Sequence, residues 1–192
     1  MKAKKRLLLL LALVAVLAAV SAMYAYDTVE GRTRNVITTG KVEISINETS
    51  PDKAGMITGT VTAQGIEFDN ILPGQTASKL VTIRNDAEPC WLRVRVGVSV
   101  EPEPDDGSDP AELIVPNING NKWTKNGDYY YYDDVLSTGD VTEPALFDSV
   151  LFAPEMGNAY AGSTVKLTVE AEAIQYKNNE VASATQAWGD GA

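Results

Sequence analysis

The stretch from Ile71 to Val100 reads ILPGQTASKLVTIRNDAEPCWLRVRVGVSV and contains the plainest strand patterns in the chain. From Trp91 to Val100 apolar residues occupy every second position without a break, which predicts a strand with one buried face. Ser78 to Asn85 carries a shorter apolar pattern of the same kind. Because residues 85–89 between them are turn formers, we predict that the two strands form an antiparallel hairpin.

Further segments predict strands by the same criteria. They are the alternating runs Lys41 to Glu48 and Ser163 to Tyr176, the bulky apolar run Leu146 to Phe152, and the weaker run Met56 to Ala63. No segment shows an amphipathic pattern of helix length. The sequence therefore predicts an all-β fold, an antiparallel two-sheet sandwich of jelly-roll type over residues 41–176. We expect residues 177–192 to be a polar tail whose Ala-rich part forms a short helix or frays.

The first 25 residues have the composition of a secretory leader. Four basic residues, Lys2, Lys4, Lys5 and Arg6, precede an apolar run of 14 residues from Leu7 to Val20. This run is short for a transmembrane helix, which needs about 20 residues. We therefore predict a signal helix within residues 1–25 and a protein secreted to the extracellular matrix or cell surface. An uncleaved N-terminal anchor is the alternative, and both place the domain outside the cytoplasm.

Small residues at the end of the leader mark the cleavage site. We predict cleavage after Ala25, which makes Tyr26 the first residue of the mature chain, with cleavage after Ala22 as second choice. Loss of residues 1–25 removes four basic residues and no acidic one, so the formal net charge falls from −10 to −14. Without a basic cluster, the mature chain is not expected to bind nucleic acid, and the membrane is a partner only through the uncleaved leader.

The residue inventory argues against catalysis. The sequence has no histidine, which removes the usual base of a serine or cysteine nucleophile and the commonest zinc ligand. It also lacks a G-x-S-x-G motif and a Gly-rich phosphate loop. The carboxylate pairs Asp105-Asp106 and Asp133-Asp134 lie in turn-like contexts without an apolar pocket. We predict no catalytic, cofactor-binding or metal-binding residues and no enzymatic activity.

Two features each allow two interpretations. Cys90 is the only cysteine and forms no internal disulfide, and a buried, inert thiol is expected over a reactive or intermolecular one. Residues 101–110, EPEPDDGSDP, form an acidic loop that cannot join a sheet interior. A plain solvated loop is favoured, and calcium binding through carboxylates is the alternative, although the EF-hand spacing is absent.

Residues 122–134, KWTKNGDYYYYDD, predict a second hairpin around Asn126-Gly127. The four tyrosines place two rings on each face of one strand. One interpretation is an aromatic contact face for a sugar or a partner protein, formed by Trp123, Tyr129, Tyr130, Tyr131 and Tyr132. The favoured interpretation is a strand whose inward pair fills the core and whose outward pair covers a neighbour.

Several passages taken together resemble the TasA and camelysin family of exported proteins from Gram-positive bacteria. They are the lysine- and leucine-rich leader ending in MYAYD (23–27), RNVITTGKVEI (34–44), LPGQ (72–75), VTIRN (81–85), PCWLRVRV (89–96), DYYYY (128–132), GSTV (162–165) and EAEA (170–173). Each passage is an ordinary turn or strand, but their order spans almost the whole chain.

The resemblance implies a jelly-roll subunit of fibres in the extracellular biofilm matrix, with a leader cut by a signal peptidase of the SipW type. In that family the newly exposed N-terminal segment is thought to complete the sheet of the next subunit. Residues 26–40 lack a strand partner close in sequence, so they are the expected strand-donor segment, with Asp27, Val29, Val36 and Ile37 as its members. The implied partners are further copies of the chain in a head-to-tail homopolymer, that peptidase, and other matrix proteins as a further option.

Two other functions stay open at this point. The first is a cell-surface binding or adhesion module that uses the aromatic contact face. The second follows from the resemblance to camelysin, which is a reported metallopeptidase. Zinc would then be held by carboxylates alone, a poor ligand set for this ion, so the peptidase ranks last.

Overall fold

The structure, a computed structural model, describes residues 36–39, 41–62, 65–68, 71–160 and 162–189, which all belong to the compact unit Gly31–Ala192. The predicted signal helix and residues 26–35 of the predicted donor segment lie outside the described residues. Within the described part of the chain, no helix is long and apolar enough to cross a bilayer.

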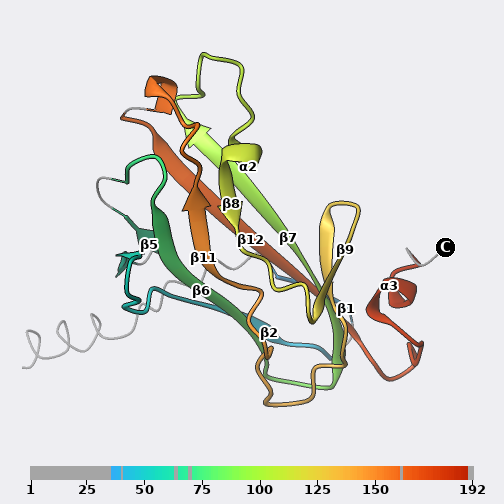
Figure 1. Cartoon of the computed structure of the whole chain (residues 1–192). Coiled ribbons are helices and arrows are strands. Elements are labelled where there is room, and N and C mark those ends of the chain that lie inside the picture. Colours follow the sequence, from blue (N-terminus) through green and yellow to red (C-terminus); the bar gives the residue numbers. More distant parts are fainter. Residues whose placement is uncertain (1–35, 40, 63–64, 69–70, 161, 190–192) are drawn as a thin grey trace, which may run out of the picture. The chain divides into compact units, whose positions relative to one another are not determined.

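Strands dominate the fold and form two five-stranded sheets and one small hairpin (Figure 1). The first sheet has the order β1 (Val36–Thr39), β12 (Thr164–Gln175), β7 (Cys90–Glu101), β10 (Tyr129–Tyr132) and β9 (Trp123–Asn126). The second has the order β2 (Ile44–Thr49), β6 (Thr76–Asn85), β11 (Phe147–Phe152) and β8 (Ile114–Pro116), and β3 (Ile57–Thr58) also pairs with β6. The hairpin consists of β4 (Thr60–Thr62) and β5 (Gly65–Glu67), and the helices are α2 (Pro110–Leu113), η1 (Asn158–Tyr160) and α3 (Ala184–Ala187).

The two sheets pack as a sandwich, as the sequence predicts. In the first sheet β7 and β12 pair antiparallel over all twelve residues of each strand, and Figure 1 shows them side by side. In the second sheet β6 pairs antiparallel with β2 and with β11. Among the described strands, only β1 and β3 pair in parallel. The apolar faces between the sheets form the main core, which includes Val81, Ile83, Leu92, Val94, Ile114, Leu146, Phe147 and Val169.

The predicted hairpin between β6 and β7 is wrong. These consecutive strands lie in different sheets, so residues 86–89 carry the chain from the second sheet to the first. The partners of β7 are β12 and β10, and those of β6 are β2, β3 and β11. This crossing turns the apolar faces of two consecutive strands toward each other across the core, whereas a hairpin would have placed both in one layer.

Asn85 holds the crossing in place. Its side chain is fully buried, and its Nδ2 donates to the backbone carbonyls of Glu88 and Leu136, both at 2.9 Å. Its Oδ1 accepts from the backbone N–H of Ala87 at 3.1 Å. Leu136 also exchanges backbone hydrogen bonds with Cys90, the first residue of β7. Another conformation of the loop would leave this buried amide without its hydrogen-bond partners, which is costly in free energy. The amide therefore holds the loop in one conformation.

A charged pair is buried on the second sheet. Lys79 of β6 and Glu48 of β2 form an ion pair of 2.7 Å, and their side chains are 6% and 8% exposed. Glu48 lies opposite the core residue Val81 in the β2–β6 register, two positions from Lys79. Two charges withdrawn from water in this way are tolerated only while both partners are present.

We predict that Glu48→Ala lowers the free energy of unfolding by about 3–5 kcal/mol, because it leaves the Lys79 ammonium buried without its partner. The double variant Glu48→Leu/Lys79→Met should unfold at or above the wild-type free energy, since it removes both charges and keeps the volume. Urea unfolding followed by circular dichroism measures both values. An equal decrease in the free energy of unfolding in the single and double variants would contradict this account of the ion pair.

Candidate functional site

The described part of the predicted donor segment is the edge strand β1. Val36 to Thr39 pair in parallel with Ala171 to Ile174 of β12 in the same chain, with Val36 opposite Ala171 and Ile37 opposite Glu172. The structure thus places two of the four predicted donor residues at an edge of the first sheet. The other predicted positions, Asp27 and Val29 of the donor segment and Ala22, Ala25 and Tyr26 at the cleavage site, lie outside the described residues.

The outer edge of β12 is covered only in part. β7 pairs with all twelve residues of β12 from one side, whereas β1 pairs with four of them from the other side. Among the strands that the structure describes, none pairs with this outer edge from Thr164 to Glu170. An edge that has no partner over this length would offer main-chain N–H and C=O groups to an added strand.

The core residues beside this edge are less buried than those further along β12. Val165 and Leu167 pack against the main core but are only half-buried, whereas Val169 and Ala171 on the same face are 1% and 0% exposed. The core therefore becomes more accessible toward the Thr164 end of β12. A strand added there would cover apolar surface as well as main-chain groups, and each covered Å² contributes roughly 25 cal/mol.

Cross-strand ion pairs hold β12 to β7 on the outer face of the first sheet. Glu172 pairs with Arg93 at 2.7 Å, and Glu170 pairs with Arg95. Tyr129 lies with its ring centroid 3.9 Å from the Arg93 guanidinium carbon, and its hydroxyl donates to Glu172. Burial lowers the pKa of Arg93, but hydrogen bonds to Tyr131 and Glu172 outweigh it, so the pKa lies above its ordinary value. These contacts fix β12 whether or not β1 is present.

Most of the predicted aromatic contact face lies in the interior, which corrects that interpretation. Trp123 and Tyr132 are 2% and 5% exposed, with ring centroids 5.0 Å apart, and both donate to backbone carbonyls. Tyr131 is 1% exposed on the opposite face of β10. Only Tyr129 and Tyr130 are half-buried. The five rings cannot form one surface, because the two faces of the strand each pack against a different part of the protein.

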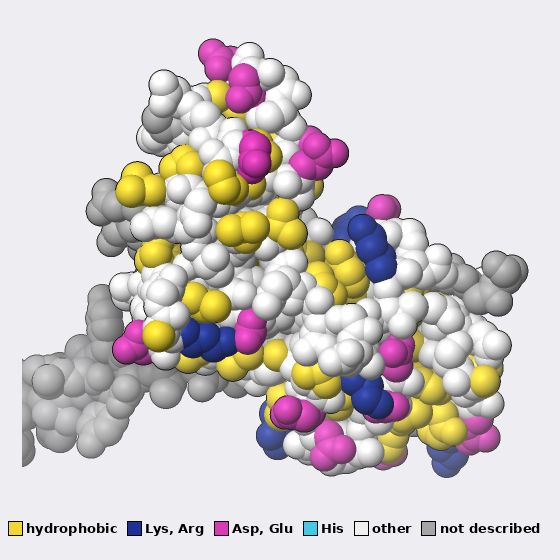
Figure 2. Space-filling view, in the orientation of Figure 1, with side chains coloured by type: hydrophobic (Ala, Val, Ile, Leu, Met, Phe, Trp, Pro, Cys, Tyr) yellow, Lys and Arg dark blue, Asp and Glu magenta, His cyan; other side chains and the backbone are white. Residues whose placement is uncertain are grey.

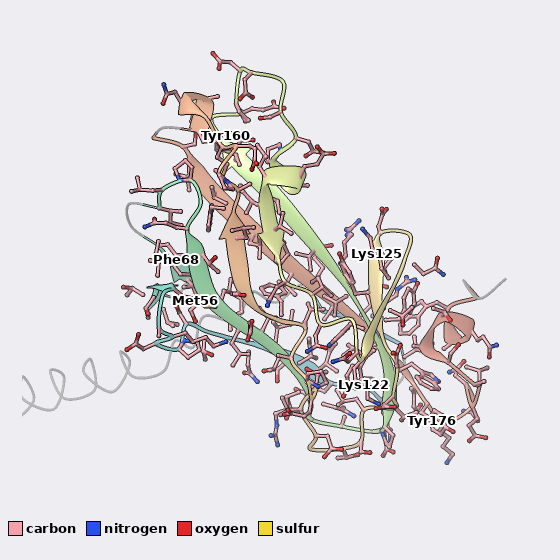
Figure 3. All side chains as sticks on the ribbon, in the orientation of Figure 1. Met56, Phe68, Lys122, Lys125, Tyr160 and Tyr176 are labelled. Atoms are coloured by element: carbon pink, nitrogen blue, oxygen red, sulfur yellow. The ribbon has the colours of Figure 1, made fainter. Side chains whose placement is uncertain are left out.

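Residues 177–189, here called the C-terminal strap, cover the outer face of the first sheet near β10. Ser183 caps α3, and Trp188 lies edge-on to Tyr131 at a centroid distance of 5.9 Å and over Arg93 at 4.9 Å. Trp91 donates its indole N–H to the carbonyl of Asn179. A second core forms there around Trp91, Tyr131 and Ala184. Tyr176, which follows β12 and is labelled in Figure 3, packs against the same cluster.

The strap refines the prediction for residues 177–192. Part of this segment forms a short helix, which was one of the two expectations. The described residues are nevertheless more than a polar tail, because Trp188 and Ala184 contribute to a buried cluster. The strap also explains why Trp91, on the polar face of the β7 pattern, is only 4% exposed.

The acidic loop after β7 is organised by its own carboxylates. Asp106 accepts hydrogen bonds from the N–H and the hydroxyl of Ser108, which lower the pKa of Asp106, and Asp109 caps α2. The Ser108 hydroxyl also bonds the hydroxyl of Tyr160, labelled in Figure 3, while Figure 2 shows acidic side chains around this end of the molecule. Within the described residues, no group of three or more acidic or cysteine side chains is placed to hold a metal ion. The calcium alternative therefore gains no support.

Comparisons with known proteins assign no family to this chain. No protein-family model matches the sequence, and no curated protein is significantly similar to it. The passages quoted in the sequence analysis are therefore the basis of the family resemblance.

Sequence reasoning missed the open edge of β12 as a site. The alternation of residues 163–176 predicts a strand but carries no signal for its place in the sheet. An edge differs from a central strand in its partners, which lie far away in sequence. The half-buried Val165 and Leu167 look like ordinary core residues in the sequence pattern.

Cys90 should be inert toward alkylation in the folded protein. It is fully buried, and burial raises the pKa of its thiol to about 12. We expect iodoacetamide at about pH 8 to leave the native protein unmodified and to modify it in concentrated urea, because the thiolate is the attacking species. Since the folded pKa exceeds the unfolded one, this group's contribution to stability is lost as pH rises above about 9. Rapid labelling of native protein, read by intact mass, would contradict the burial.

Trp188 should anchor the strap. We expect Trp188→Ala to lower the free energy of unfolding by about 1–3 kcal/mol, because it removes the contacts with Tyr131 and Arg93. Val181→Ala, an exposed change in the same strap, should cost less than about 0.5 kcal/mol. Chemical unfolding of the two variants makes the comparison. If both variants match the wild type, the strap does not stabilise the fold.

Proposed function

We propose that this protein is an exported structural subunit of extracellular biofilm matrix fibres, which assembles by donating its N-terminal strand to the next subunit after the leader is removed. The observation that supports this most is the outer edge of β12, where the N-terminal strand β1 covers four residues and the rest has no partner among the described strands. The family resemblance supports the same mechanism, because in that family the segment freed by cleavage is thought to complete a neighbouring sheet.

Donor and acceptor agree in length. β1 pairs with β12 at a constant offset, with Val36 opposite Ala171. In that register Val29 would lie opposite Thr164, so residues 29–39 are long enough to follow the edge from Thr164 to Ile174. Residues 30–34, EGRTR, do not alternate apolar and polar positions. Binding along that part would rest on main-chain hydrogen bonds more than on side chains.

Such an assembly need not close on itself. The donor segment of one copy and the β12 edge of another are different surfaces, so their contact is heterologous, and repeated contacts of this kind give filaments. The adhesion alternative has weaker support, because Trp123, Tyr131 and Tyr132 are not at the surface.

Fibre formation should depend on the donor segment. We expect protein beginning at Tyr26 to form fibres in negative-stain electron microscopy, and protein beginning at Lys41 to remain monomeric because it lacks the donor. The shorter protein keeps the β12 edge, so it should accept a donor without offering one. Small amounts of it, added to the longer protein, should therefore shorten the fibres.

Circular dichroism and chemical unfolding of the shorter protein provide the control for folding. If both proteins form fibres, the N-terminal segment is not needed for assembly. Absence of fibres from the longer protein across concentrations would contradict the proposed function as a whole.

A further inference from the structure

We propose that β1 is a self-cap: in the free subunit it occupies part of its own acceptor edge, and it leaves before the same segment of a second copy pairs there. The inference rests on the proposed function and adds how assembly is controlled. Its basis is the ladder between β1 and Ala171–Ile174 within one chain, which places donor and acceptor of the same subunit together.

The self-cap is held to the first sheet by a short ladder on one side. β1 has four residues and pairs along one side, whereas β12 pairs with β7 over twelve residues. The outer face of β12 is also tied to β7 through Arg93–Glu172 and Arg95–Glu170. Departure of β1 therefore leaves the acceptor edge preformed, and no refolding of β12 is needed before another strand binds.

The chain is fixed again immediately after β1. The carbonyls of Lys41 and Glu43 accept hydrogen bonds from the backbone N–H groups of Glu88 and Asp86, and Val42 is only 7% exposed. Gly40 alone separates β1 from this anchored segment. The arm that exchanges thus ends at position 40, and the remainder of the domain keeps its contacts when β1 moves.

The partner is a second copy of this chain, because its N-terminal segment carries the sequence that already pairs with this edge. Exchange replaces a ladder within one chain with the same ladder between two chains. At these four positions the hydrogen bonds lost are therefore formed again, as in domain swapping. The equilibrium between free subunits and fibres is then set by the protein concentration and by any additional strand pairing along Thr164 to Glu170. Assembly should start slowly, because β1 has to leave first, and preformed fibre ends should accelerate it.

A disulfide between β1 and β12 of one chain tests the self-cap. Ile37 and Glu172 are register partners, and neighbouring strands lie about 4.8 Å apart, which is within the Cα separation that a disulfide spans. We expect oxidised Ile37→Cys/Glu172→Cys to remain monomeric in sedimentation and electron microscopy. The reduced form should assemble at the rate of the matched control Ile37→Ser/Glu172→Ser. Intact mass under non-reducing conditions verifies an intrachain bond, and the buried Cys90 does not compete.

The oxidised variant also separates this inference from the proposed function. Because its own strand stays on the edge, it should not shorten wild-type fibres, unlike protein beginning at Lys41. Equal assembly of the oxidised and reduced forms would contradict the self-cap and leave fibre formation intact, whereas a wild-type protein without fibres would contradict the proposed function. A second pair, Val36→Cys/Ala171→Cys, keeps Glu172. If the serine control assembles poorly, the assembly of the oxidised and reduced forms of this second pair is compared in its place.

Discussion

The antiparallel ladder between β7 and β12 is the interaction on which the rest of the structure depends. Its inner face contributes Leu92, Val94 and Val169 to the main core, and its outer face carries the ion pairs of Arg93 and Arg95. One side of the ladder continues into the β9–β10 hairpin, and the other ends at β1. Because all twelve residues of both strands are paired, this ladder is the longest pairing between the described strands.

The outer faces of β7 and β12 differ along their length. Near β10, the C-terminal strap covers Trp91 and Tyr131, and Arg93 lies between Tyr129 and Trp188. Toward the other end, small and charged residues such as Gly97 and Lys166 are exposed. Charged side chains on an edge strand disfavour unspecific pairing with other chains. Lys166 therefore disfavours indiscriminate association at the part of β12 that has no outer partner among the described strands.

Local patterns predicted the individual strands well and their partners poorly. The period of two located β7 and β12, and Asn126-Gly127 located the β9–β10 hairpin, because these signals are contained within a few residues. The prediction of a β6–β7 hairpin failed because a four-residue connection has the same turn formers whether the chain stays in its sheet or crosses to the other. In the structure the crossing is held by the buried side chain of Asn85, whose hydrogen-bond partner Leu136 lies far away in sequence.

The candidate site shows the same limit. The four tyrosines were correctly divided between two faces by their alternation, but the cover over Tyr131 comes from the strap, whose Trp188 belongs to no periodic pattern. The donor segment was suggested by its position after the leader and by a family resemblance. Its acceptor could not be predicted, since an edge exists only once all strands of a sheet have been placed.

Under the proposed function, a partly covered edge would let the subunit persist alone before assembly. A fully open β12 would invite pairing with any extended chain, and a fully paired one would accept no partner. The short parallel strand on Ala171–Ile174 lies between these limits. It covers the edge beside the best-packed part of the core, and Thr164 to Glu170 have no partner on that side among the described strands. In the proposed exchange only the four-residue ladder between β1 and β12 has to break. Under this proposal, β1 would set how readily the subunit assembles, whereas the ladder between β7 and β12 would maintain the stability of the domain.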